Sequence, residues 1–152
     1  MPMHRVTATA RIDAPPTRVY AVLADYRGHP RMLPERCSDL RIERGGVGTG
    51  TIVRVRLKLA GRTVTRRAAI TEPEPGRVLV ETGLEGRMAV TTFTVTPADG
   101  GCASDVTIST ELRVAAGVAG LLQRFLATRL LHPIWVRRLE LLSACVCSGA
   151  VE

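Results

Sequence analysis

Residues 5–37 read RVTATARIDAPPTRVYAVLADYRGHPRMLPERC, and this stretch decides the fold because it joins a strand to short helices. Apolar and polar residues alternate over 5–12, a pattern that predicts a half-buried strand. Pro15 and Pro16 end that strand. Proline is favourable in the first turn of a helix, because the N–H that it lacks would have no partner there. We therefore predict a short helix over 16–25, with its apolar side chains on one stripe.

The next segment, LADYRGHPRMLPERCSDL over 23–40, combines a histidine, a cysteine, a tyrosine and acidic residues with two prolines. Pro30 and Pro34 favour turns, so we interpret the segment chiefly as a loop and a second short helix. His29 precedes a proline and is expected at a turn, although histidine is also the commonest general acid or base. Cys37 is expected to be a small, partly buried residue where the second short helix ends.

From residue 40 to residue 113 the chain alternates in short segments that turn signals separate. The clearest alternation lies over 51–59, with Val53, Val55, Leu57 and Leu59 against Arg54, Arg56 and Lys58. Ala60-Gly61 predicts a tight hairpin, so 62–71 is expected to return beside 51–59. Further strands are predicted over 40–42, 77–83, 87–96 and 105–113. Together with 5–12, these segments predict a seven-stranded antiparallel sheet.

A long helix is predicted from about Ala116 to Val146, and it is the only element long enough to cover the sheet. Pro133 lies inside it and predicts a kink near His132, because an interior proline removes a backbone hydrogen bond. The apolar stripe is expected to face the sheet and to rotate after the kink. It runs through Val118, Leu122, Phe125 and Leu126, and then through Trp135, Leu139, Leu142 and Val146.

The composition is basic but lacks features of nucleic-acid-binding and membrane-spanning proteins. The chain has 152 residues and a net charge of +7, with dispersed arginines and one Trp, two Tyr and two Phe. Platforms that stack single-stranded nucleic acid need more aromatic residues, so nucleic acid is not an expected partner. The sequence has no run of about 18 apolar residues and no signal-peptide pattern. We therefore expect a cytoplasmic protein with one domain over 1–152.

The four cysteines, Cys37, Cys102, Cys145 and Cys147, are expected to be free thiols in a reducing compartment. Cys145 and Cys147 are close enough in sequence to chelate a metal, but no second pair follows at ligand spacing. Neither a metal nor a cofactor is therefore expected.

Five motifs carry a resemblance to a known superfamily: IDAPPTRVYAVLAD at 12–25, LPERC at 33–37, GTGT at 48–51, PGRVLVET at 75–82 and TTFTVTP at 91–97. Their order and spacing over about 5–146 resemble the helix-grip superfamily. It includes START lipid-transfer domains, the birch-pollen allergen fold and bacterial polyketide cyclase/dehydrase-like proteins. DYRGHPRMLPERC at 25–37 looks most like the coenzyme Q-binding and polyketide cyclase-like branches.

The resemblance implies an α+β helix-grip fold, in which a seven-stranded curved antiparallel sheet wraps around a long C-terminal helix, with two short helices after strand 1. It also implies a deep cavity between sheet and helix. We expect this cavity to bind a small hydrophobic ligand of polyketide, lipid, isoprenoid or quinone type. The predicted wall consists of Tyr26, Met32, Leu33, Val53, Val55, Leu57, Val64, Phe93, Val95, Ile108, Leu122, Phe125 and Leu126.

Two arginines are candidates for polar contacts with that ligand. Arg66 shares strand parity with apolar residues of 62–71, so it faces the cavity if the strand is regular. A bulge or an acidic partner is the alternative that we favour, because bulges are common in strongly bent sheets. Arg129, beside Phe125, either contacts the ligand or extends from the rim into solvent.

Two other functions remain open. The resemblance allows a polyketide aromatase/cyclase or dehydratase in which Arg66 or His29 assists enolisation. However, the sequence shows no triad, and Glu81 and Glu111 are expected to face outward. The second alternative is a partner-binding module, because Arg54, Arg56 and Lys58 form a basic stripe on the outer sheet face that suits an anionic partner. A homodimer also remains open.

Overall fold

Seven strands, two α-helices and two short 3₁₀ helices form the part of the chain that the computed structural model describes, residues 2–59, 61–85 and 89–148. They are β1 (Met3–Ile12), α1 (Pro16–Ala24), η1 (Tyr26–Met32), β2 (Cys37–Arg44), β3 (Ile52–Leu59), β4 (Arg62–Glu74), β5 (Val78–Gly83), β6 (Val90–Ala98), η2 (Asp99–Gly101), β7 (Ala103–Arg113) and α2 (Gly117–Cys147). Ala60 of the predicted hairpin and residues 87 and 88 of the strand predicted over 87–96 lie outside the described residues.

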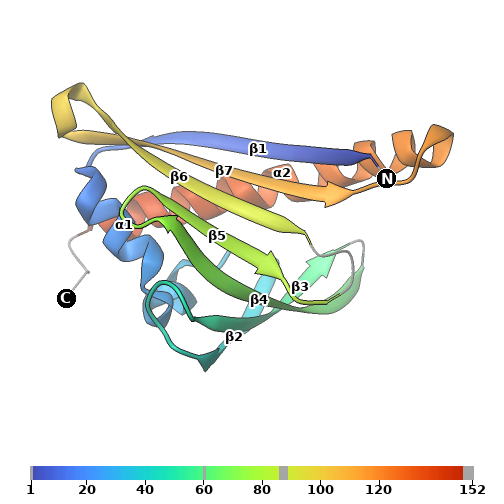
Figure 1. Ribbon diagram of the computed structural model, residues 1–152, viewed down its shortest axis with the longest axis horizontal. Helices are drawn as coiled ribbons and strands as arrows, with labels where there is room; N and C mark the ends of the chain where they lie inside the picture. Colours follow the sequence, from blue (N-terminus) through green and yellow to red (C-terminus); the bar gives the residue numbers. More distant parts are fainter. Residues whose placement is uncertain (1, 60, 86–88, 149–152) are drawn as a thin grey trace.

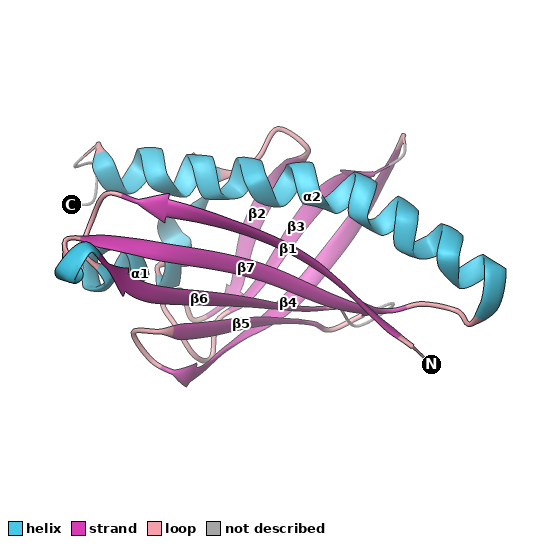
Figure 2. Cartoon of the chain, turned by 90° about the horizontal axis from the view of Figure 1, so that it is seen from above, coloured by secondary structure: helices cyan, strands magenta, loops and turns pink. Residues whose placement is uncertain are grey.

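The strands form one antiparallel sheet in the order β1-β7-β6-β5-β4-β3-β2. Figure 1 shows this curved sheet with α1 at one end and the start of α2 at the other. Figure 2 shows α2 running along the sheet. The predicted helix-grip fold is thereby confirmed, including the two short helices after the first strand. None of the described helices is long and apolar enough to cross a membrane.

Strand β2 is longer than the predicted segment 40–42, because Cys37 and Ser38 also pair with β3. The β2–β3 ladder shifts register between Ser38 and Arg41, and Asp39 between them has a left-handed φ of 53°. Irregularities of this kind bend a strand and increase its twist. The strand was underpredicted because its exposed residues leave only a short apolar pattern.

Helix α2 is continuous through Pro133, and its axis bends along its length (Figure 2). Its C-terminal half closes the core, since Leu139, Leu142 and Val146 are buried as predicted. The core that they complete also contains Val19, Leu23, Leu79, Phe93, Val95, Val106 and Ile108.

The N-terminal half of α2 contradicts the predicted orientation. Val118, Leu122 and Phe125 are 84%, 58% and 59% exposed, so these three residues of the predicted stripe face solvent rather than the sheet. Residues on the other side of this half, such as Ala127 and Leu130, line a cavity instead. The prediction failed because both sides of this half are apolar, so periodicity alone cannot choose between them.

Candidate ligand-binding cavity

A cavity of about 440 Å³ lies between the sheet, η1 and α2. Ligand-binding cavities in proteins are typically 300–1,000 Å³ and mainly apolar, with a few placed polar groups. The cavity fits that description. Its apolar wall includes the predicted residues Tyr26, Met32, Leu33, Val53, Val55, Leu57, Phe93 and Leu126, together with Leu130, Leu131, Trp135 and Leu142 of α2.

Six other residues predicted to line the cavity lie elsewhere in the structure: Val64, Val95, Ile108, Leu122, Phe125 and Arg129. Val95 and Ile108 are fully covered in the core, where helices close the sheet. Val64 is half-buried on β4 towards the β3–β4 hairpin. The remaining three lie on the solvent side of α2, where Arg129 is placed 6.0 Å from the centre of the Phe125 ring.

A buried polar cluster of Tyr26, Glu81 and Arg138 forms part of the cavity wall. Arg138 donates two hydrogen bonds to the Glu81 carboxylate, from Nη1 at 3.1 Å and from Nη2 at 2.8 Å. The Tyr26 hydroxyl donates a third, at 2.6 Å to Oε2. The side chains of Arg138 and Glu81 are only 20% and 12% exposed. The guanidinium also lies 4.7 Å from the centre of the Phe93 ring, so an aromatic face supports the cation.

These contacts fix the charges of the cluster. Burial opposes ionisation of Glu81, but Arg138 and Tyr26 outweigh it and hold the pKa of the carboxyl below its usual value. Burial likewise opposes the charge on Arg138, yet Glu81 raises the pKa of the guanidinium. Burial and the Glu81 charge raise the pKa of Tyr26 well above its usual value. Near neutral pH the wall therefore presents an ion pair and a protonated hydroxyl.

The prediction that Glu81 faces outward is wrong. In the ladder Leu79 lies opposite Phe93 and Glu81 opposite Thr91, which places Glu81 on the inner face. Val78, Leu79 and Val80, which precede Glu81, are apolar on both faces, so their pattern does not show which face is inward. Glu111, in contrast, is exposed and pairs with Arg5 at 3.1 Å.

His29 is buried inside η1 rather than placed at an open turn, because it is only 4% exposed. Its ring centre lies 4.0 Å from that of Tyr26, and Nε2 lies 2.7 Å from the Leu23 carbonyl oxygen. A carbonyl only accepts hydrogen bonds, so Nε2 carries the proton. Burial, with the nearby positive charge of Arg138, lowers the pKa of His29 to about 4. The ring is therefore neutral near pH 7, and Nδ1 is its unprotonated nitrogen.

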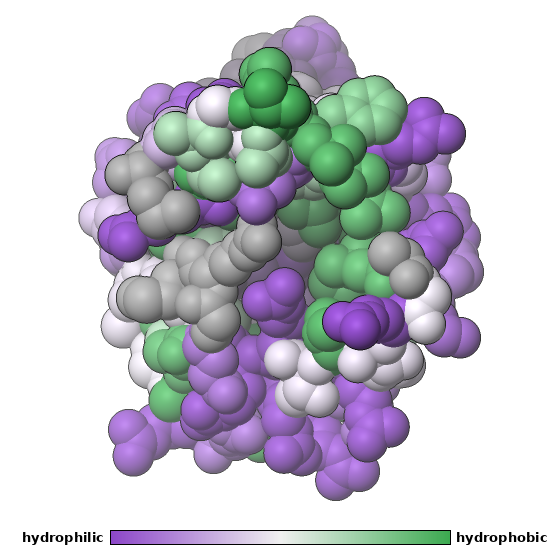
Figure 3. All heavy atoms as spheres, turned by 90° about the vertical axis from the view of Figure 1, so that its right-hand side faces the viewer, coloured by the Kyte–Doolittle hydropathy of each residue, from purple (hydrophilic) through white to green (hydrophobic). Residues whose placement is uncertain are grey.

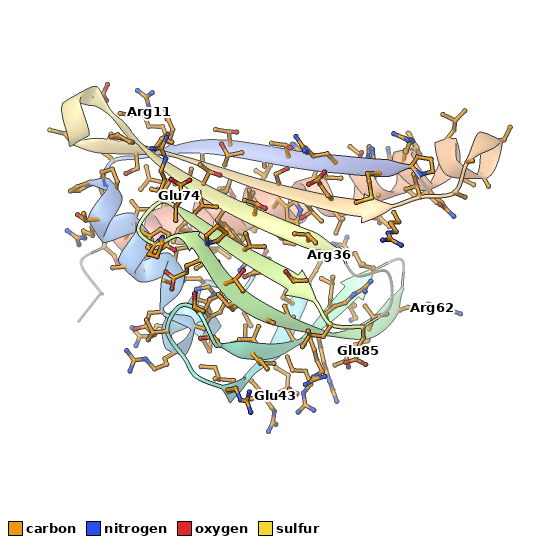
Figure 4. All side chains as sticks on the ribbon, viewed as in Figure 1. Arg11, Arg36, Glu43, Arg62, Glu74 and Glu85 are labelled. Carbon is orange, nitrogen blue, oxygen red and sulfur yellow. The ribbon has the colours of Figure 1, made fainter. Side chains whose placement is uncertain are left out.

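Arg66 lies on the cavity wall in an exposed position. The β3–β4 ladder is regular around it and pairs Arg66 with Val55, so the favoured alternative of a bulge is wrong. Within the described ranges Arg66 makes neither a hydrogen bond nor an ion pair. Arg67, next in sequence, pairs with Glu43 at 2.8 Å and with Glu85 at 3.5 Å. Figure 4 labels these two acidic residues, which lie in the lower part of the view.

The predicted basic stripe lies on the outer face, but acidic residues of β2 accompany it. Arg54 is 3.9 Å from Glu43 and Arg56 is 3.8 Å from Asp39. These contacts reduce the positive charge that Arg54, Arg56 and Lys58 present to a partner.

Among the cysteines of the described residues, Cys37 lines the cavity. Cys37 is half-buried there, and burial raises the pKa of its thiol, so it is protonated. Cys145 packs against the core, and Cys147 is exposed.

Comparisons with known proteins agree with this geometry. The family model for "polyketide cyclase / dehydrase and lipid transport" matches residues 3–144. The KanY protein (ms6282) is 28% identical with a TM-score of 0.83, over 96% of this chain and 99% of that chain. The Zhui aromatase/cyclase from Streptomyces sp. R1128 is 19% identical with a TM-score of 0.81, over 98% and 96%.

A START superfamily protein from Mycobacterium smegmatis has the same fold, with 16% identity and a TM-score of 0.75 over 95% of this chain and 98% of that chain. A comparison with curated proteins gives no match. The resemblance to the helix-grip superfamily is thus confirmed. The chain belongs to the polyketide cyclase/dehydrase and lipid transport family, because the model of that family matches nearly the whole sequence.

Proposed function

We propose that the protein binds a small hydrophobic ligand with a carbonyl or hydroxyl group in this cavity, of polyketide or quinone type. The observation that carries the proposal is the Tyr26–Glu81–Arg138 cluster in an otherwise apolar wall. Burying an ion pair costs desolvation energy that apolar residues would avoid, so a polar cluster facing a cavity suits a polar ligand group. The apolar wall supplies affinity, at about 0.8 kcal/mol for each CH₂ removed from water.

Arg138 has the capacity to bind such an oxygen. A guanidinium has five N–H donors, and Glu81 accepts only two of those of Arg138. The remaining donors suit a ligand carbonyl, which only accepts. A long saturated chain would leave them unpaired, so a ligand with ring or chain carbonyls is the better match.

A substitution that fills the cavity with a larger side chain tests whether the ligand binds there. Ala127 lies on the cavity side of α2, and phenylalanine there would occupy space that the ligand needs. We expect Ala127→Phe to weaken binding of menadione, a small naphthoquinone, by at least about tenfold. Trp135 is the only tryptophan and lines the cavity, so quenching of its fluorescence reports binding. Ala144→Phe, at an exposed position of the same helix, is the matched control. Equal affinities for menadione in both variants would exclude the cavity as the binding site.

Arg66 is proposed to attract an acidic ligand group at the edge of the cavity. We expect Arg66→Ala to weaken binding of dodecanoate by about twofold to fivefold, since the exposed guanidinium is screened by water. Binding of dodecanol, which has no charge, should not change. Both ligands can be measured by competition with menadione, with Arg56→Ala on the outer face as control. If Arg66→Ala weakened the binding of dodecanoate and of dodecanol equally, the charge of Arg66 would not be what attracts the ligand.

A cyclase or dehydratase is the second candidate, because His29, Tyr26 and Arg138 place a neutral base, a hydroxyl and a cation at one wall. A general base works best when its pKa is near the working pH. The pKa of His29, about 4, is too low for that near neutral pH. Binding is therefore the better supported function. If a poly-β-ketone substrate is turned over and Arg66 assists its enolisation, Arg66→Ala is expected to abolish turnover and leave the fold intact.

A further inference from the structure

The N-terminal half of α2 presents an apolar face to solvent, and of its residues only Leu126 also lines the cavity. We call Val118, Leu121, Leu122, Phe125 and Leu126 the α2 apolar face; their exposed fractions are 84%, 66%, 58%, 59% and 43%. They repeat at three- and four-residue intervals, so they share one side of the helix. Figure 3 views this end of the molecule and shows apolar side chains gathered beside a hollow. Contiguous apolar surfaces of this kind are typical of contact sites.

The charged residues of the segment that carries this face are of one sign. From Arg113 to Leu139 the sequence contains no acidic residue, and Arg113, Arg124 and Arg129 lie in this segment. Arg129 lies 6.0 Å from the centre of the Phe125 ring, so a cation borders the most exposed aromatic side chain of the helix. In the described part of the chain none of these three arginines forms an ion pair. An exposed apolar stripe with arginines is the pattern of helices that lie in the interface of anionic membranes.

A second copy of the chain is a poorer partner for this face. In a two-fold dimer the same residues would meet, so the arginines of one copy would approach those of the other. The net charge of +7 on each copy adds to that repulsion. An anionic lipid surface instead offers acyl chains to the apolar residues and negative headgroups to the arginines.

We propose that the α2 apolar face docks the protein on anionic lipid membranes. Leu126 belongs both to this face and to the cavity wall. Docking therefore places the membrane next to the cavity, and an apolar ligand can pass between them with little exposure to water.

Co-sedimentation with vesicles tests the proposal. We expect the protein to bind vesicles of phosphatidylcholine with phosphatidylglycerol more tightly than phosphatidylcholine alone, and binding should weaken as salt rises. Leu122→Ser with Phe125→Ser is expected to lower the partition coefficient by at least about tenfold. Both side chains are exposed, so the thermal midpoint should not fall. Val47→Ser is the control, because Val47 is 53% exposed and lies beside α1.

Three results would overturn the proposal. The first is no binding to either type of vesicle. The second is vesicle binding that the double serine variant retains. The third is a dimer in light scattering that the double serine variant converts to a monomer, since a second copy would then cover the face. Arg124→Gln with Arg129→Gln should reduce the preference for phosphatidylglycerol. Menadione binding in the cavity is measured separately, so a protein that does not bind vesicles can still be shown to bind a ligand in the cavity.

Discussion

Replacing Arg138 with methionine is expected to lower the free energy of unfolding by about 3–5 kcal/mol, because Glu81 is left buried without its positive partner. The two hydrogen bonds at 2.8 and 3.1 Å and the low exposure of both side chains make this ion pair costly to break. Urea unfolding followed by circular dichroism measures the loss.

The double variant Glu81→Gln with Arg138→Met separates the charge effect from packing. Glutamine keeps an oxygen that can accept from the Tyr26 hydroxyl and removes the unpaired charge. Most of the lost stability should therefore return, which makes the two substitutions strongly non-additive. Additive losses, or a single variant within about 1 kcal/mol of the wild type, would show that the pair is not a buried ion pair.

The second large effect is a pH dependence of stability that His29 causes. Its pKa is about 4 in the folded protein and has an ordinary value of 6.5, so below pH 6.5 the unfolded chain binds a proton that the folded protein does not. Stability is therefore complete above pH 6.5 and falls as the pH is lowered towards 4. Between about pH 7.5 and pH 5 the loss should be about 2 kcal/mol.

His29→Gln is the matched variant, because its amide can still donate to the Leu23 carbonyl. It should remove the loss between about pH 7.5 and pH 5, where ordinary carboxylates remain ionised. Glu81 and Asp25 have lowered pKa values, so their contributions are lost only at lower pH. The same slope in variant and wild type would mean that folding does not lower the pKa of His29.

The sequence predicted the elements of this fold well where one side of an element is apolar and the other is charged. Over 51–59 valine and leucine alternate with arginine and lysine, so both the strand and its inner face follow. The proline pair at 15 and 16 similarly fixed the start of α1. The motifs then supplied the topology, which alternation cannot give.

The polar site was missed because both of its charged members lie in segments that are apolar on two sides. Val78, Leu79 and Val80 are all apolar, so the sequence does not show on which face of β5 Glu81 lies. Only the pairing of Leu79 with Phe93 shows that this face is the inner one. Arg138 lies next to the exposed Arg137, and only the packing of α2 against the sheet shows that Arg138 points inward. Long-range packing, rather than a local pattern, brings the pair together.

Native mass spectrometry of the freshly purified protein tests the central claim, that the cavity holds a small hydrophobic ligand, most directly. The expected result is a population of molecules that carry the additional mass of an apolar small molecule. Ala144→Phe should retain this mass and Ala127→Phe should lose it. A wild-type spectrum that contains only the bare polypeptide, together with no quenching of Trp135 by menadione, would contradict the claim.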